Sequence, residues 1–181
     1  MKDFNKDNMR KYLVIFCIFF TVSSSFAALA PRMYSIMAQV NTGIFQSTDA
    51  AGSQYYNNRM SVDVLYLVRG GPTFGARYLL ESRNENQTNS GEAYGPLVGY
   101  YGESGLFMVF NYDIWAKSGN WTNGEGFQFS LGYLEHFGNS WHIGAEISGR
   151  KIRYKTDITN SLAVSKDVTD YYPSISLMYL Y

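Results

Sequence analysis

Alternation of polar and apolar residues recurs along most of the chain, and it constrains the fold more than any other feature of the sequence. Successive side chains of a β-strand point to opposite faces, so a period of two predicts strands with one apolar and one polar face. The pattern predicts eight strands, of which the fourth is the shortest. We expect them at residues 33–41, 59–69, 73–83, 95–101, 106–115, 127–134, 141–150 and 171–181.

The expected connections alternate between short turns and long polar loops. The short turns follow the second, fourth and sixth strands, at residues 70–72, 102–105 and 137–140. The other connections are long, and three of them are the polar stretches 84–93, 117–126 and 151–170. Pro96 is expected to mark the loop end of the fourth strand, because Pro cannot donate to a ladder. Short turns at one rim and long loops at the other are typical of membrane β-barrels.

The short turns also allow the register of two strand pairs to be predicted. A slip of one residue would exchange the two faces, so the alternation rules it out. Across residues 70–72 we expect Val64 opposite Tyr78 and Asp63 opposite Leu79. Across residues 137–140 we expect Tyr133 opposite Ala145, Gly132 opposite Glu146 and Gln128 opposite Arg150.

The distribution of charge indicates which face meets lipid. In a soluble lipocalin-like barrel the apolar face would point inward. Here the apolar faces carry no charge, and no Lys lies between Lys11 and Lys117, although Lys commonly protects solvated strands. Aromatic residues also gather near the strand ends, as in interfacial girdles. We therefore expect a lipid-facing exterior and an interior ion-pair network of Arg59, Asp63, Arg77, Glu81, Asp113, Glu146 and Arg150.

The amino-terminal segment has the composition of a secretory signal peptide. Basic residues precede an apolar run at 12–21, and small residues follow it. The run is too short for a transmembrane helix. Cleavage after Ala27 would divide the chain into a signal peptide, residues 1–27, and a barrel domain, residues 28–181. Cys17 would leave with the signal peptide, and one cysteine allows no internal disulfide.

The last predicted strand carries the most specific pattern, in which Ile175, Leu177, Tyr179 and Tyr181 alternate with other residues. With this strand the chain resembles the small eight-stranded outer-membrane barrels of the OmpX type and the OmpA transmembrane domain. Most such proteins end in Phe, so Tyr181 departs from the pattern. The resemblance implies a monomer in the outer membrane of a Gram-negative bacterium, surrounded by lipid and lipopolysaccharide. It also implies that the barrel-assembly machinery reads the final strand.

The expected function is a structural or surface-interaction role, exerted through the loops of a barrel with a plugged lumen. Eight strands make a barrel that its own side chains can fill. A narrow porin-like channel is the first alternative, and a lipid A-modifying membrane enzyme is the second. The formal net charge of zero argues against a nucleic-acid partner.

We expect no catalytic site, cofactor or metal. Only two histidines occur, His136 and His142, and both flank the turn at 137–140, at the rim opposite to the one where known lipid A enzymes of this shape work. Two His residues without a third ligand are weak evidence for a metal. Lys151, Arg153 and Lys155 begin the longest loop, and we expect them to contact lipopolysaccharide phosphates. The alternative for this loop is a solvated segment of mixed charge.

Overall fold

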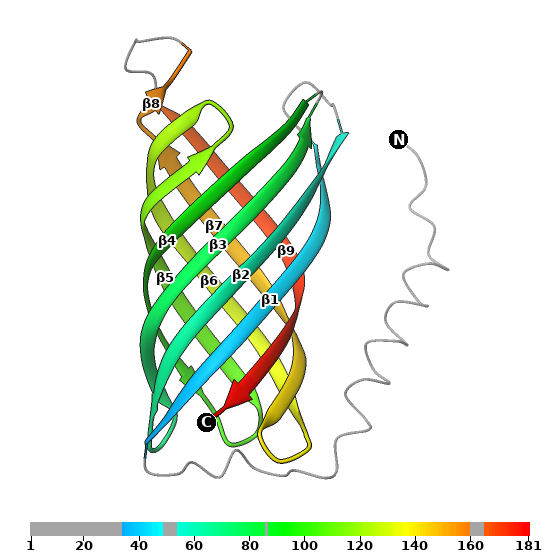
Figure 1. Ribbon diagram of the computed structural model, residues 1–181, viewed down its shortest axis with the longest axis vertical. Coiled ribbons are helices and arrows are strands. Elements are labelled where there is room, and N and C mark those ends of the chain that lie inside the picture. The colour runs from blue at the N-terminus through cyan, green and yellow to red at the C-terminus, as the bar shows by residue number, and fades with distance from the viewer. Residues whose placement is uncertain (1–33, 49–53, 86, 160–164) are drawn as a thin grey trace, which may run out of the picture.

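The computed structural model describes residues 34–48, 54–85, 87–159 and 165–181, which form an all-β structure. The predicted signal peptide, residues 1–27, lies outside the described residues. Figure 1 shows a single barrel of long tilted strands. The strands are β1 (Tyr34–Thr48), β2 (Gln54–Val68), β3 (Pro72–Glu85), β4 (Gln87–Tyr101), β5 (Leu106–Ser118), β6 (Trp121–Phe137), β7 (Trp141–Tyr154), the two-residue β8 (Thr156–Asp157) and β9 (Lys166–Leu180).

The eight long strands form one closed antiparallel sheet. Each pairs with its neighbour along the chain, with β7 followed by β9, and β9 pairs back with β1. The short strand β8 is an addition at the rim, where it pairs with the first residues of β6. The predicted fold class, an eight-stranded up-and-down barrel, is confirmed.

No helix within the described ranges is long and apolar enough to cross a membrane.

The strands extend further toward the loop rim than the alternation predicted. Residues 84–93 and 117–126 were expected to be loops, but β3 and β4 pair as far as Glu85 with Gln87, and β5 and β6 as far as Ser118 with Trp121. The stretch 151–170 also contains the end of β7 and the start of β9. The alternation fades there because these residues are polar on both faces, whereas the backbone ladder continues regardless of side chain.

The register is as predicted for one strand pair and wrong for the other. Between β6 and β7 the three predicted pairs are present, Gln128 with Arg150 among them. Between β2 and β3, Asp63 lies opposite Arg77 rather than Leu79. This is a shift of two residues, which preserves both faces and therefore leaves no trace in the alternation.

The turn between β2 and β3 explains the observed register. Gly70 and Gly71 have φ angles of 91° and 103°, in the left-handed region that favours glycine. The Gly71 amide donates to the Val68 carbonyl at 3.1 Å, which closes the turn directly after β2. The tight turn brings Asp63 directly opposite Arg77, the partner it needs inside the barrel.

Pro96 does not mark a loop end, because it lies inside β4 opposite Ala76. The register between β4 and β5 shifts between Tyr94 and Leu97, so the ladder on that side is interrupted at Pro96. A residue without an amide hydrogen is tolerated at such a bulge.

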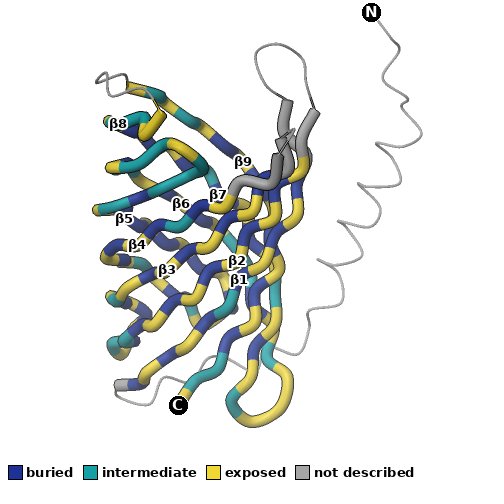
Figure 2. Tube along the Cα trace, turned by 45° about the horizontal axis from the view of Figure 1, so that its top comes forward, coloured by how far each residue is buried: buried dark blue, intermediate teal, exposed yellow. Residues whose placement is uncertain are grey.

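The apolar faces point outward, as predicted. Exposed and buried residues alternate along much of the described length of the long strands in Figure 2. On β5 the five outward residues from Leu106 to Ile114 are all apolar or aromatic, and all are exposed. Tyr66 with Phe74, and Trp141 with Tyr179, form aromatic pairs near the short turns, with ring centroids 5.3 Å and 4.9 Å apart.

The lumen is not polar along its whole length. The end near the short turns is filled by a buried apolar cluster that the sequence analysis did not predict. Its members are Met37, Leu65, Leu67, Leu97, Tyr101, Phe107, Val109, Leu134 and Met178. A second buried cluster, which includes Ile152 and Tyr154, lies toward the loop rim. Each large side chain fully buried in this way stabilises the fold by roughly 1.5–3 kcal/mol.

Replacing Ser130 and Ser148 with Cys is expected to give a disulfide between β6 and β7. The two residues are direct partners, and their hydroxyl oxygens lie 2.7 Å apart. The test uses a chain in which Cys17 is replaced by Ser, and it follows mild oxidation by non-reducing electrophoresis. Gln128→Cys with Ser148→Cys is the control, because diagonal partners lie beyond disulfide reach. More efficient cross-linking of the control pair would contradict the register.

Candidate functional site in the lumen and at its mouth

All seven charged residues expected in the interior are buried in the lumen. They reach it from β2, β3, β5 and β7, and the structure adds Arg83 of β3 and Asp170 of β9 to them. Eight of these nine residues form two groups of ion pairs, one around Glu81 and one around Asp63, and Glu146 belongs to neither group.

Glu81 is the centre of the first group. Its Oε2 atom lies 2.8 Å from Nη2 of Arg59 and 3.4 Å from Nη1 of Arg150, and its Oε1 atom lies 3.2 Å from Nη2 of Arg83. Asp170 pairs with Arg59, and the Arg150 Nε atom lies 3.0 Å from Asp113. Among these ion pairs, one connects β2 with β9 and another connects β3 with β7. They therefore join strands that are not neighbours in the sheet.

The Arg59 guanidinium also rests against two aromatic rings. Its central carbon lies 4.9 Å from the Phe45 ring centroid and 4.6 Å from that of Tyr172. A cation over an aromatic face is favourable when it is shielded from water. Arg59 is therefore fixed by carboxylates at its nitrogens and by rings at its faces.

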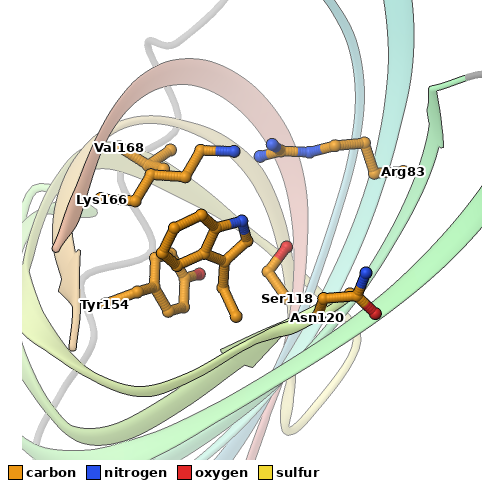
Figure 3. A pocket seen from close by; sticks show the side chains of 8 residues that line it. Arg83, Ser118, Asn120, Tyr154, Lys166 and Val168 are labelled. Atoms are coloured by element: carbon orange, nitrogen blue, oxygen red, sulfur yellow. The ribbon is translucent and has the colours of Figure 1, made fainter. Parts of the chain in front are cut away.

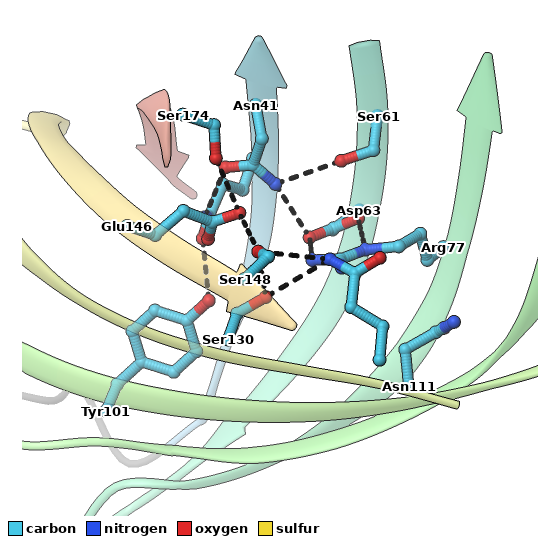
Figure 4. A network of polar contacts seen from close by, with 12 residues as sticks. Asn41, Ser61, Asp63, Arg77, Tyr101, Asn111, Ser130, Glu146, Ser148 and Ser174 are labelled. Carbon is cyan, nitrogen blue, oxygen red and sulfur yellow. Dashed lines mark hydrogen bonds and ion pairs between the residues drawn. The ribbon is translucent and has the colours of Figure 1, made fainter. Parts of the chain in front are cut away.

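Arg77 and Asp63 form the second group, which is drawn in Figure 4. Arg77 donates twice to the Asp63 carboxylate, from Nε to Oδ1 at 2.7 Å and from Nη2 to Oδ2 at 2.6 Å. Asn41 donates to the same Oδ2 atom at 3.1 Å. A two-pronged contact of this kind is among the strongest that a carboxylate makes in proteins.

Glu146 differs from the other four buried carboxylates. Among the described residues, no Arg or Lys nitrogen lies within 4.0 Å of it. Its Oε1 atom accepts hydrogen bonds from Ser174 at 3.0 Å and from Ser148 at 3.3 Å, and its Oε2 atom has no hydrogen-bond partner among the described residues. The described lumen thus holds four arginines and five carboxylates, and Glu146 is the carboxylate in excess.

The sequence analysis missed Arg83 and Asp170 as members of the network. Asp170 had been assigned to a loop, because the eighth strand was predicted to start one residue later. The two-residue period was the available signal, since Asp170, Tyr172 and Ser174 are all buried on the inner face of β9. Arg83 ends the third expected strand, where the two-residue period puts it on the same face as Arg77 and Glu81.

The basic residues expected to contact lipopolysaccharide lie on or next to β7 rather than in a long loop. Lys151 and Arg153 are exposed, and Arg153 donates to Asp167 from Nε at 2.8 Å and from Nη2 at 3.0 Å. This hydrogen-bonded guanidinium holds the pKa of Asp167 below its usual value. Lys155 pairs with Glu125. The rim is therefore a surface of paired charges in which Lys151 adds a further cation.

The two histidines and the final strand lie where the alternation places them. His136 and His142 face each other across the β6–β7 ladder, with ring centroids 5.0 Å apart. No group of three or more His, Cys, Asp or Glu residues in the described ranges could hold a metal ion. On β9, Ile175 and Leu177 are exposed on the outer face, Tyr179 packs on Trp141, and Tyr181 follows the strand.

No protein-family model matches the chain, and no curated protein matches its sequence. Two solved structures are similar to it at 15% identity and a TM-score of 0.32. One is described as outer-membrane expressed OmpT of Vibrio cholerae, and the other as in-vitro folded OmpT, an outer membrane protein of Vibrio cholerae in a trimer form. The matches cover 82% and 85% of this chain but only 52% and 54% of those chains, so the present chain spans about half their length.

Asp63→Asn and Glu146→Gln are expected to destabilise the protein to very different extents, although both replace a buried carboxylate with an amide of similar size. Asp63→Asn leaves Arg77 buried without a counter-charge, which costs about 3–5 kcal/mol. Glu146→Gln removes a carboxylate that has no cationic partner, so we expect a loss below about 1 kcal/mol. Urea unfolding in detergent micelles, followed by tryptophan fluorescence, measures both. Equal destabilisation would show that Glu146 is paired after all.

Proposed function

We propose that this chain is an integral outer-membrane protein of a Gram-negative bacterium, similar in type to the OmpX and OmpA barrels. In this proposal its lumen is closed, and its role is structural or one of surface interaction through the loop rim. It is a monomer without catalytic activity or cofactor. Its partners are membrane lipid, lipopolysaccharide and, during assembly, the barrel-assembly machinery that reads Ile175, Leu177, Tyr179 and Tyr181.

One observation carries the proposal: an uncharged apolar belt surrounds a barrel whose charges are inside. The outward residues of β5 from Leu106 to Ile114 span nine residues, which matches the 9–11 residues of a tilted transmembrane strand. Outward charges in the described strands lie beyond this span, at Glu92, which accepts a hydrogen bond from Tyr78, and at Glu135 and Lys151. In water such a surface would be far larger than the apolar patches that soluble monomers expose.

The arrangement of the lumen supports a plugged barrel over a channel. The ion pairs around Glu81 cross the interior, and the apolar cluster with Phe107 and Met37 fills the end near the short turns. An ion on this route would have to separate buried pairs and then cross an apolar layer, which are both costly.

Lys151, Arg153 and Lys155 support a role for the rim in contact with lipopolysaccharide. Arg and Lys are the residues that bind phosphate groups in proteins. Lys151 lies on the outer face of β7, in line with the apolar belt below it. A cation at the edge of the apolar belt suits the proposed contact with lipid phosphate groups.

Electrophoretic mobility and conductance test the proposal together. The purified, folded protein is expected to migrate differently with and without boiling, because a closed barrel resists detergent until it is heated. The same preparation in planar lipid bilayers is expected to show no steady conductance. Identical migration of both samples would contradict the membrane barrel, and a stable conductance would contradict the closed lumen.

Two matched leucine substitutions test the apolar belt. Leu131 and Leu106 are exposed to 52% and 51%, but Leu131 lies near the middle of the belt and Leu106 at its edge. Arg in place of a lipid-facing residue costs about 2–4 kcal/mol at the midplane and about 0–1 kcal/mol near the interface. Leu131→Arg should therefore destabilise the protein in lipid vesicles much more than Leu106→Arg, as measured by urea unfolding. Similar values for both would mean that the belt does not face lipid.

A further inference from the structure

His142, at the short-turn end of the lumen, has a ring nitrogen without a hydrogen-bond partner. The residue is only 3% exposed, and its Nδ1 atom makes no hydrogen bond to any described residue. Buried polar atoms are nearly always paired, so an unpaired one is a candidate to bind an ion or a ligand. The cations of the loop-rim pocket in Figure 3 are instead engaged, because Arg83 pairs with Glu81 and Lys166 lies over the Trp121 ring.

His142 is the middle member of a row of three potential metal ligands. Its direct partner on β6 is His136, and its direct partner on β9 is Met178. Direct partners on neighbouring strands point to the same face, with Cβ atoms about 4.5–5.5 Å apart. That face is the lumen, because His142 and Met178 are both buried. In a barrel of eight strands the inward side chains meet in a narrow interior.

The two imidazole rings have the separation that a shared ion requires. Their centroids lie 5.0 Å apart, and their planes are inclined by 70°. Two imidazoles that bind one metal ion at about 2.0–2.1 Å have centroids about 4.5–5.2 Å apart when the angle at the metal is between about 90° and 110°. The observed separation of His136 and His142 lies within this range.

The surroundings of the two histidines suit a metal site at the end of the lumen. The His142 ring is hydrogen-bonded to the backbone of Ser140. A metal-ligating histidine usually makes such a contact through the nitrogen that does not bind the ion, and the contact orients the ring. His136 is only partly buried, so an ion can reach the row from the short-turn rim.

Met178 supplies the third ligand and decides which metal fits. The described residues contain no group of three His, Cys, Asp or Glu that could hold a metal ion. Met178 adds a thioether to the two histidines, and it is fully buried in the apolar cluster that fills this end of the lumen. A thioether is a soft ligand that selects Cu⁺, and imidazole also suits copper. Zn²⁺ sites, in contrast, are built from thiolate, imidazole and carboxylate groups.

We propose that His136, His142 and Met178 bind one Cu⁺ ion at the short-turn end of the lumen. The ligands are two imidazole nitrogens, the His142 Nδ1 atom among them, and the Met178 sulfur. The site goes beyond the proposed function and does not depend on it, because binding is measured on the folded barrel in detergent whatever its role in the membrane.

Competition with a chromogenic Cu⁺ chelator under anaerobic conditions tests the site. The protein is the untagged full-length chain with Cys17→Ser, because a cysteine thiolate is itself a soft copper ligand. We expect one Cu⁺ ion per chain. His142→Gln and Met178→Leu should each weaken binding by at least about tenfold, since even the loss of a group that only orients a ligand costs about 10–100-fold.

Met37→Leu is the matched control for Met178→Leu. Met37 is equally buried and belongs to the same apolar cluster, but its direct partners in the two ladders are Leu65 and Leu180 rather than a histidine. The change from Met to Leu conserves volume, so both variants should fold. Heat-modifiability shows for each variant whether the barrel is intact, which separates failure of the barrel from failure of the site.

X-ray absorption at the copper edge distinguishes a ligand from a residue that only shapes the site. We expect a sulfur neighbour of copper in the protein with Met178 and none in Met178→Leu at saturating copper. A sulfur neighbour that persists in Met178→Leu would overturn Met178 as the ligand. Absence of Cu⁺ binding to the folded protein, or equal weakening by Met37→Leu, would overturn the proposed site.

Discussion

Closure of the sheet between β1 and β9 is the contact on which the rest of the structure depends. A strand with an unpaired edge leaves a row of amide and carbonyl groups without partners, and only closure removes every edge. The ladder that closes the barrel between β1 and β9 consists of six residue pairs, from Met37 with Leu180 to Thr42 with Ile175. It is the shortest ladder between long strands in the described barrel. Beyond it Pro173, which has no amide hydrogen to donate, still pairs with Ile147 on the β7 side. The unpaired side of β9 thus begins at Ser174 and includes Pro173, which has one backbone polar group fewer to satisfy there.

Closure also decides the chemistry of the interior. Once the inner faces are sealed from water, each charge on them needs a partner, because an unpaired charge in a medium of low dielectric is costly. All four buried cations of the described lumen are arginines. Arg offers a planar fork that contacts several carboxylate oxygens at once, which a lysine ammonium cannot do in the same way. Arg59 uses this fork to reach both Glu81 and Asp170.

The sequence predicts the faces of the strands well, because burial on one side forces a period of two. It predicts the register only where a further constraint acts. Around residues 137–140 the register was correct, whereas around residues 70–72 it was two residues off, since such a shift exchanges no faces. The true register depends on the positive φ angles of Gly70 and Gly71, which a count of alternating residues does not include.

The residues that face the lumen could be predicted in part, again because burial on one side of a strand forces a period of two. The seven charged residues stand at inward positions that the alternation identifies. The apolar cluster near the short turns was missed because its members, such as Leu65 and Leu97, interrupt the polar face and look like irregularities in sequence. Asp170 was missed because β9 continues beyond the point where its outer face stops being apolar. Beyond that point the outer residues no longer follow an apolar pattern, so only the backbone ladder continues the strand.

The strand ladders continue beyond the apolar belt, and this limits the conformational freedom of the residues at the loop rim. Ser118 pairs with Trp121, and Tyr154 pairs with Lys166, so these residues stand on paired strands rather than on unsupported loops. The short strand β8 adds a second partner for Trp121 through Asp157. Side chains on paired backbone lose less conformational freedom when a ligand binds, which leaves more of the contact energy for affinity. If these residues lay in unpaired loops, each binding event would also have to order the loop backbone.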